Sequence, residues 1–223
     1  LQWAREAAAR GIPALFLTFD ETPERLALKT LCAAAELEQK DFAEGRGDLA
    51  ALEQARREWG KRLLALYFIE GAASMTVSQL RARTMQAMER HSAESAFVVV
   101  DYIQRWAGGR YQGSGEFRHD IGKLIGELRD ELANPLRIPV LAVSSQNRAG
   151  QNTAQFLSLA ESSSLEYTGD TVMFLVEDKK GTAIYPNRAV KLVVRKNRFG
   201  DMGEVPLIFA PHRVQMREEY LRV

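Results

Sequence analysis

Three apolar segments of the sequence end directly in polar side chains that could carry out chemistry. In chain order, the segments and the polar groups after them are 14-ALFLTF-19 with Asp20 and Glu21, 96-AFVVV-100 with Asp101, and 138-IPVLAV-143 with Ser144, Ser145, Gln146 and Asn147. Ligands of an open parallel sheet bind beyond the carboxyl ends of its strands, so these polar ends predict one shared site. Ordinary turn chemistry is the alternative, because polar residues favour the turns that follow strands.

An apolar strand closed by an aspartate, as in 97-FVVVD-101, has the Walker B form. In that form the carboxylate holds Mg²⁺, usually through water, beside the β- and γ-phosphates of a nucleotide. Asp20 and Glu21 would then supply the base that orients an attacking water. The pattern alone has low specificity, because a strand followed by aspartate is common.

Two cations, Lys196 and Arg198, lie two residues apart in 196-KNRFG-200, after the apolar segment 189-AVKLVV-194. A lysine and an arginine at a strand end can present positive charge to an anion such as a phosphate. Solvation of an ordinary strand end is the simpler alternative.

Segments that alternate between strand-like and helix-like patterns must position these side chains. Short, almost wholly apolar runs predict strands at residues 14–19, 65–69, 96–100, 138–143, 172–176, 189–194 and 205–209. Helices are expected at residues 1–10, 22–37, 48–62, 76–90 and 116–133, a loop at 107–115, and a long loop or broken helix at 147–165. The last three strands lack intervening helices, so we predict one α/β domain over residues 1–223. Its mostly parallel sheet is flanked by helices and has a C-terminal antiparallel extension.

The composition is that of a globular protein, with 46% apolar and 26% charged residues in 223. A net charge of +1 neither favours nor excludes a nucleic-acid partner, so any basic surface must be local. The single cysteine, Cys32, excludes an internal disulfide and indicates a reducing, cytoplasmic compartment. The three scattered histidines predict no structural metal, and no apolar run approaches the roughly 18 residues of a membrane helix.

Five segments in chain order resemble RecA-like ATPases of the group that includes DnaB-family replicative helicases, RadA and KaiC. They are 14-ALFLTFDETPERL-26, 100-VDYIQRW-106, 139-PVLAVSSQNR-148, 161-ESSSLEYTGDTVMFL-175 and 196-KNRFG-200. The first four resemble DnaB-family segments, although adjacent acids at 20 and 21 are closer to KaiC-like ATPases, and the last matches the KNRFG motif of the RadA branch. The resemblance implies a RecA-like fold, ATP and Mg²⁺ as cofactors, and self-association into a ring or filament such as a hexamer.

The resemblance also assigns roles to the acids and the cations. Asp20 aligns with the catalytic carboxylate, and Glu21 is its helper, or the base itself if the alignment shifts by one residue. Asp101 is the acid linked to Mg²⁺. Lys196 and Arg198 become a pair that reaches the γ-phosphate bound on a neighbouring subunit.

The polar residues after 138–143 are assigned to the nucleotide end of the site. Gln146, or else Ser145, occupies the sensor position that couples the γ-phosphate to loops facing DNA. Ser144 and Ser145 are grouped with the nucleotide-binding residues.

Two features depart from the family pattern. The P-loop motif G-x-x-x-x-G-K-[ST] is absent from these residues, and Leu1 falls within the helix that should follow it. We expect the P-loop to lie just upstream, and a degenerate ATPase without one is the alternative. The stretch 161-ESSS-164 lacks a glycine found in the helicases, and Ala160 replaces a frequent arginine, which affects the expected DNA loop more than the ATP site.

Two segments are candidates for binding single-stranded DNA. Residues 104–119 and 148–165 are expected to be loops, and their arginines are Arg105, Arg110, Arg118 and Arg148. Trp106 and Tyr111 interleave with the arginines of the first segment, a combination that suits a strand-binding surface. A loop of this composition without function is the alternative.

Three functions are therefore compatible with the sequence. The first is an ATP-driven DNA helicase or translocase, and the second is a RadA- or KaiC-like ATPase switch in recombination or regulation. The third is a non-catalytic oligomerisation module with a RecA-like fold.

Overall fold

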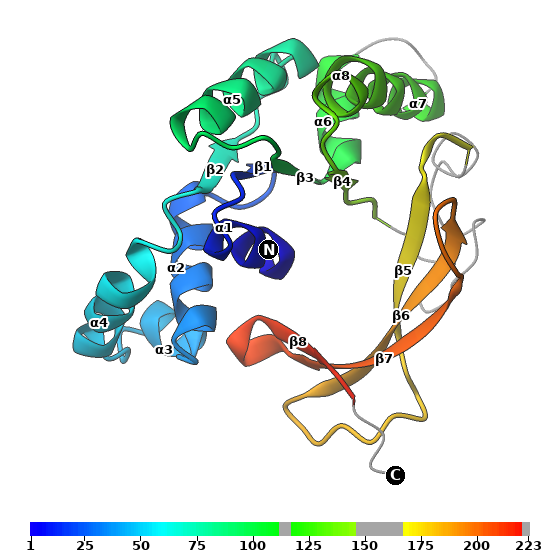
Figure 1. Ribbon diagram of the computed structural model, residues 1–223. Helices are drawn as coiled ribbons and strands as arrows, with labels where there is room; N and C mark the ends of the chain where they lie inside the picture. Colours follow the sequence, from blue (N-terminus) through cyan, green and yellow to red (C-terminus); the bar gives the residue numbers. More distant parts are fainter. Residues whose placement is uncertain (112–116, 146–166, 220–223) are drawn as a thin grey trace. The chain divides into compact units, whose positions relative to one another are not determined.

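The computed structural model describes residues 1–111, 117–145 and 167–219. The chain divides into two compact units, Leu1–Ser144 and Ser145–Val223. Figure 1 labels the helices and strands of both units. No helix among the described residues combines the length and the apolar character needed to cross a lipid bilayer.

The first unit is built on a four-stranded parallel sheet in the order β2-β1-β3-β4. The strands are β1 (Ala14–Thr18), β2 (Leu66–Glu70), β3 (Phe97–Asp101) and β4 (Val140–Ala142). All five residues of β1 are buried, as expected for a central strand covered by helices on both faces. The register sets Thr18 of β1 level with Glu70 of β2 and with Asp101 of β3.

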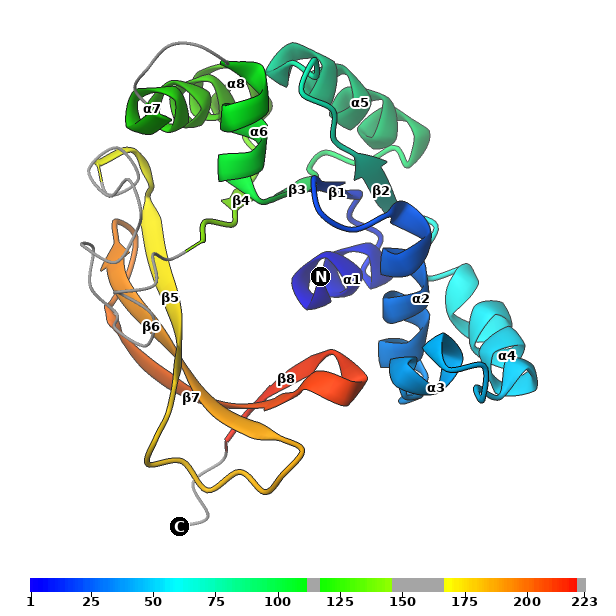
Figure 2. The same cartoon turned by 180° about the vertical axis from the view of Figure 1, so that it is seen from behind.

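Helices cover both faces of this sheet. They are α1 (Gln2–Ala9), α2 (Pro23–Ala34), α3 (Gln39–Ala43), α4 (Leu49–Gly60), α5 (Val77–Arg90), α6 (Ile103–Arg110), α7 (Phe117–Glu127), the π-helical turn η1 (Leu128–Ala133) and α8 (Asn134–Leu136). Figures 1 and 2 show α1 and α2 on one side of the sheet, and α5, α6 and α7 on the other. Threonine caps the N-termini of α2 and α5. The Thr22 side chain accepts from the amide of Arg25, and Thr76 forms a capping box with Gln79.

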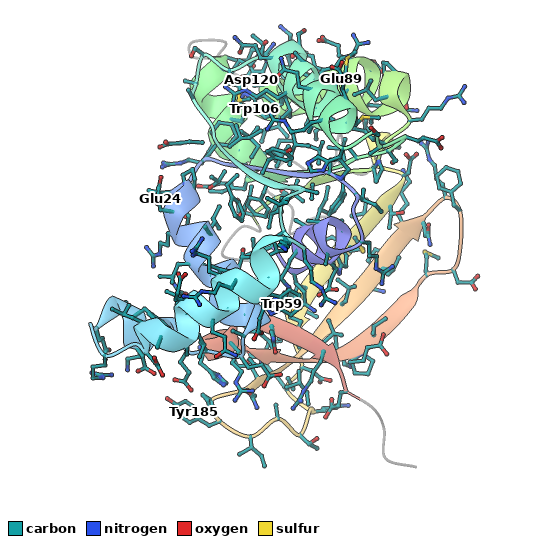
Figure 3. All side chains as sticks on the ribbon, turned by 60° about the vertical axis from the view of Figure 1, so that its left-hand side comes forward. Glu24, Trp59, Glu89, Trp106, Asp120 and Tyr185 are labelled. Atoms are coloured by element: carbon teal, nitrogen blue, oxygen red, sulfur yellow. The ribbon has the colours of Figure 1, made fainter. Side chains whose placement is uncertain are left out.

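Each face of the sheet has its own apolar layer because successive strand residues point in opposite directions. On the α1 side, Ala4 and Ala8 pack with Phe16 and Val99. On the other side Trp106 of α6 is completely buried, and Figure 3 shows it among the helices. Its indole Nε1 donates to the Met75 carbonyl at 3.0 Å, which satisfies the polar atom of a buried ring.

The second unit is an antiparallel sheet in the order β5-β6-β7-β8. Its strands are β5 (Thr171–Glu177), β6 (Arg188–Asn197), β7 (Gly203–Ala210) and β8 (Gln215–Glu218), with a short 3₁₀ turn, η4 (Pro211–Arg213), before the last. Phe174 and Val193 lie opposite each other on β5 and β6 and form its small apolar core with Val172 and Val176. Figure 2 shows these strands from behind.

The predicted α/β class, with a parallel sheet between helices and antiparallel strands at the C-terminal end, is confirmed. The antiparallel strands form a sheet of their own. The sequence did not predict α3, α6 or β8, and the interpretation of residues 104–110 as loop was wrong. Helix α6 continues through Gly108 and Gly109 because Ile103, Trp106 and Ala107 form a buried stripe at helical spacing. The segment 147–165 lies outside the described residues.

Candidate active site

The order of the parallel sheet brings the three polar strand ends side by side. Strand β3 lies between β1 and β4, and the Phe19 amide donates to the Asp101 carbonyl at 2.9 Å. On the other side of β3, the Val143 amide donates to the Val100 carbonyl, also at 2.9 Å. Asp20, Asp101 and Ser144 therefore follow neighbouring strands at one edge of the sheet, as the shared-site hypothesis requires.

A buried hydroxyl fixes the turn that carries the two adjacent acids. Thr18 is 1% exposed, and its Oγ1 donates to the Glu21 carbonyl at 2.9 Å. The same oxygen accepts from the amides of Glu21 at 3.1 Å and Asp20 at 3.4 Å. The sequence analysis missed Thr18, although a hydroxyl residue that ends a strand just before an acid pair is a signal that could have identified it.

The two acids have different surroundings. The Glu21 carboxylate pairs with Lys29, and its Oε2 lies 3.6 Å from Arg25 Nε, both cations belonging to α2. The Asp20 side chain is exposed, and its carboxylate forms no hydrogen bond or ion pair with the residues that the structure describes. Asp20 is thus the acid that is available to a ligand, whereas Glu21 is held against its own helix.

Asp101 sits in an environment that disfavours its own negative charge. Burial raises the pKa of the Asp101 carboxyl above its ordinary value, the charges of Glu21 and Asp20 raise it further, and Lys29 acts in the opposite direction. Neighbouring negative charges disfavour full ionisation of such a carboxyl, and a nearby positive charge would favour it.

The donor set fits Mg²⁺ bound partly through water. Mg²⁺ is commonly held by one or two carboxylates together with substrate phosphates and water. Asp101 and Asp20 can supply oxygen ligands of that kind, directly or through water. Within the ranges described, no three histidine, cysteine or acidic side chains converge as a metal cage.

A buried amide orients the serine at the end of β4. Gln104 of α6 is 8% exposed, and its Nε2 donates to Ser144 Oγ at 2.7 Å. Ser145 follows as an exposed residue, and Gln146 lies outside the described residues. Gln104 was not identified from the sequence. The only signal there was a glutamine close to the apolar residues Ile103 and Trp106.

The candidate arginines for DNA binding differ in what they contact. Arg105 is exposed on α6, with no side-chain partner in the part of the chain that is described. Arg110 forms an ion pair with Glu127 at 2.7 Å and lies 5.4 Å from the centre of the Tyr111 ring. Arg110 is therefore engaged within its own unit.

The other candidates in residues 104–119 and 148–165 are Arg118, Arg148 and Trp106. Arg118 lies in the first turn of α7, and Arg148 lies outside the described residues. The expectation that Trp106 belongs to a DNA-binding surface was wrong, because its ring is fully buried and stacks on Phe19, with ring centres 5.5 Å apart.

In the second unit, the cations near the end of β6 contact the chain just before β5. Arg198 Nη1 donates to Asp170 Oδ1 at 3.1 Å, and its Nη2 donates to the Tyr167 carbonyl at 3.1 Å. Lys196 Nζ donates to the same carbonyl at 3.3 Å. The neighbouring Phe199 is 84% exposed, so the tip that carries these cations is open to solvent.

The sequence matches known helicases over nearly its whole length. The family model described as DnaB-like helicase C terminal domain matches residues 1–218. The replicative DNA helicase DnaB of Pasteurella multocida (strain Pm70) is 26% identical over 211 residues, which cover 88% of this chain and 43% of that protein. The DnaB of Leifsonia xyli subsp. xyli (strain CTCB07) is 26% identical over 215 residues, covering 94% and 46%. The chain thus spans less than half the length of these relatives.

Two solved structures share the fold. One, an ATPase domain, superimposes with a TM-score of 0.82 at 19% identity, covering 97% of this chain and 78% of that one. A DnaB-like replicative helicase, solved in a study of its interactions with primase, gives a TM-score of 0.80 at 18% identity and covers 96% and 52%. The predicted RecA-like fold is confirmed, and the alternatives of a recombination or regulatory switch and of a non-catalytic module are not favoured. The chain belongs to the DnaB-like helicase C-terminal domain family.

Proposed function

We propose that this chain is the ATP-hydrolysing motor domain of a DnaB-type replicative helicase that acts on single-stranded DNA. The family match over residues 1–218 supports this activity. The observation that carries the proposal is the exposed Asp20 carboxylate, unpaired among the residues described, in the turn after β1. That strand pairs with β3, which ends in the half-buried Asp101. Such a pair of acids suits hydrolysis of a phosphoanhydride with a divalent cation.

In this proposal the residues at the parallel strand ends divide the work. Asp101 would hold Mg²⁺, through water, and Mg²⁺ would supply positive charge beside the phosphates. Asp20 orients the attacking water and accepts its proton. Glu21, paired with Lys29, holds the turn in place. Ser144 and Ser145 lie toward the nucleotide, and Gln146 acts as its sensor.

A neighbouring copy of the chain and a P-loop would complete the proposed ATP site. Lys196 and Arg198 reach the γ-phosphate bound by a neighbouring copy in a ring such as a hexamer, where they stabilise the charge of the transferring phosphoryl group. The 223 residues contain no P-loop motif, so the proposal concerns a full-length protein that supplies one.

Single-stranded DNA is proposed to be held mainly by its phosphates. Arg105 is exposed and unpaired among the described residues, so its charge is available to a phosphate. Arg148 and Arg118 are proposed as further contacts on the strength of the sequence alone. This kind of binding depends strongly on salt and little on base sequence.

Substitution of Asp20 tests the proposal in the full-length protein. Asp20→Asn removes the proton acceptor and should lower kcat for Mg²⁺-dependent ATP hydrolysis by about 10²–10⁴-fold and abolish unwinding of a forked duplex. The matched control is Glu24→Gln, because Glu24 is an exposed acid in the first turn of the same loop-helix region (Figure 3). The control should keep both activities. Equal turnover by Asp20→Asn and the control would contradict the assignment, and ATP hydrolysis without unwinding by the wild type would contradict the helicase.

A further inference from the structure

The segment before β5 holds the side chain of Arg198 from two directions. Asp170 Oδ1 accepts from Nη1 at 3.1 Å, and the Tyr167 carbonyl accepts from Nη2 at 3.1 Å. The main chains are also joined, because the Arg198 amide donates to the Asp170 carbonyl at 2.9 Å. The guanidinium is therefore fixed in both position and plane relative to the sheet.

These contacts leave most of the guanidinium available. A guanidinium has five N–H donors, and the described residues engage two of them. The other three can still bridge two oxygens of a phosphate, which is the geometry that makes arginine suited to phosphoryl groups. Asp170 and Tyr167 thus hold the group without occupying it.

The ion pair is too exposed to act as a stabilising lock. The side chains of Arg198 and Asp170 are 42% and 53% exposed, and ion pairs that are so exposed contribute little to stability. A free arginine side chain, however, loses rotamer entropy when it is ordered. A weak pair that removes part of this disorder beforehand affects the reaction more than it affects folding.

The tip that follows Arg198 is ordered by its own contacts. Asn197 Oδ1 accepts from Thr171 Oγ1 at 3.3 Å and from the Phe199 amide at 3.3 Å. A Cβ added at Gly200 would lie 2.9 Å from Asn197 Nδ2, so the chain turns where a side chain would collide. The backbone under Arg198 is therefore a fixed base from which a side chain can be aimed.

We propose that Asp170 is a positioning residue for Arg198, holding the guanidinium ready for the γ-phosphate on an adjoining copy of this chain. The inference rests on the proposed function, in which Arg198 acts across a subunit interface. In this role Asp170 touches neither ATP nor DNA, and it acts only through Arg198. The three remaining N–H donors can meet the phosphoryl oxygens as negative charge develops there, while Asp170 keeps the guanidinium in place.

Steady-state ATP hydrolysis by the assembled full-length protein tests this role. Asp170→Ala should lower kcat by about 10- to 100-fold, since a misplacement of about 1 Å can cost 10²-fold, while KM for ATP changes less than about twofold. Asp170→Asn keeps the shape and one acceptor oxygen, so its kcat should lie between those of the wild type and Asp170→Ala. The control is Asp201→Asn, which makes the same charge change near the tip at an exposed residue whose carboxylate has no partner in the described ranges.

A double-mutant cycle separates positioning from other roles. If Asp170 acts only through Arg198, then Arg198→Ala and the pair Arg198→Ala, Asp170→Ala should have the same kcat. Losses that add, or a kcat that rises in Asp170→Ala because the carboxylate had competed with phosphate, would overturn the proposal. A normal kcat in Asp170→Ala and Asp170→Asn with a reduced kcat in Arg198→Ala would overturn positioning alone. A normal kcat in Arg198→Ala would overturn the proposed role of Arg198 itself.

Discussion

Two arginines on α6 offer a matched test of which charge serves DNA and which serves the fold. Arg105 is exposed and unpaired among the described residues, whereas Arg110 pairs with Glu127 and also donates to the Met75 carbonyl at 3.4 Å. Substituting each by alanine removes the same charge from the same short helix. We expect Arg105→Ala to weaken DNA binding and Arg110→Ala to destabilise the parallel-sheet unit.

The structure gives the size of each effect. The side chains of Arg110 and Glu127 are 21% and 17% exposed, so their pair lies between a surface pair of about 0–1 kcal/mol and a buried pair of about 3–5. Hydrogen bonds to charged groups contribute about 1.5–3 kcal/mol, and Tyr111 Oη still donates to Glu127 after the substitution. A loss of roughly 1.5–2.5 kcal/mol follows for Arg110→Ala, or about 3–10 °C in Tm. Arg105→Ala should stay within about 0.5 kcal/mol of the wild type.

Two assays measure the pair of variants independently. All three tryptophans, Trp3, Trp59 and Trp106, belong to the first unit, so tryptophan fluorescence of this chain during urea unfolding reports on that unit alone. Binding of single-stranded DNA to the full-length protein is measured over a series of salt concentrations. Loss of one phosphate contact in Arg105→Ala should reduce the slope of log K against log salt by about 0.7.

The opposite pattern of results would refute the reasoning. If Arg110→Ala unfolds at the wild-type urea concentration and loses DNA affinity, its ion pair is not structural and its charge faces DNA. If Arg105→Ala binds DNA with an unchanged salt slope, its exposure does not reflect a phosphate contact.

Three further outcomes are expected. Asp101→Asn should abolish Mg²⁺-dependent hydrolysis in the full-length protein yet stabilise the fold. Burial raises the folded-state pKa of Asp101, so this group favours the folded state below its unfolded-state pKa, and that contribution is lost as pH rises through the folded-state value. The stability advantage of Asp101→Asn in urea unfolding should therefore be greater at about pH 8 than at about pH 4, and a constant difference would contradict it. Thr18→Val, which removes the hydroxyl bonded to Glu21, should lower kcat, and an unchanged kcat would show that the turn holds without it. Mixing Arg198→Ala with Asp20→Ala chains should restore part of the ATPase activity of full-length assemblies, whereas activity equal to the sum of the two separate samples would place Arg198 in cis.

Much of the site could be predicted because its signals are local. The strand ending in Asp101 is an uninterrupted apolar run, and such a run is typical of a strand buried on both faces. The acids at 20 and 21 follow another run of the same kind, and Thr22 caps the next helix through a contact with Arg25, only three residues away. Patterns of this range are encoded in consecutive residues, so the sequence alone predicted most of the strands and the longer helices and indicated a class of chemistry, although it missed α3, α6 and β8.

Tertiary structure decided which of the candidate side chains are available. The choice between Asp20 and Glu21 depends on Lys29 of α2, which pairs with only one of the two acids. Trp106 was removed from the candidates by the ring of Phe19 and by a carbonyl just before α5. Arg110 and Arg105 look alike in the sequence, yet Glu127 of α7 engages only one of them.

The physical reason is that these contacts join different elements of the fold. No local pattern encodes which side chain a distant charge or ring will meet, because that meeting depends on how the helices and strands pack. The sequence therefore predicted which side chains could carry out chemistry, while the packing of helices and strands decided which of them remain accessible.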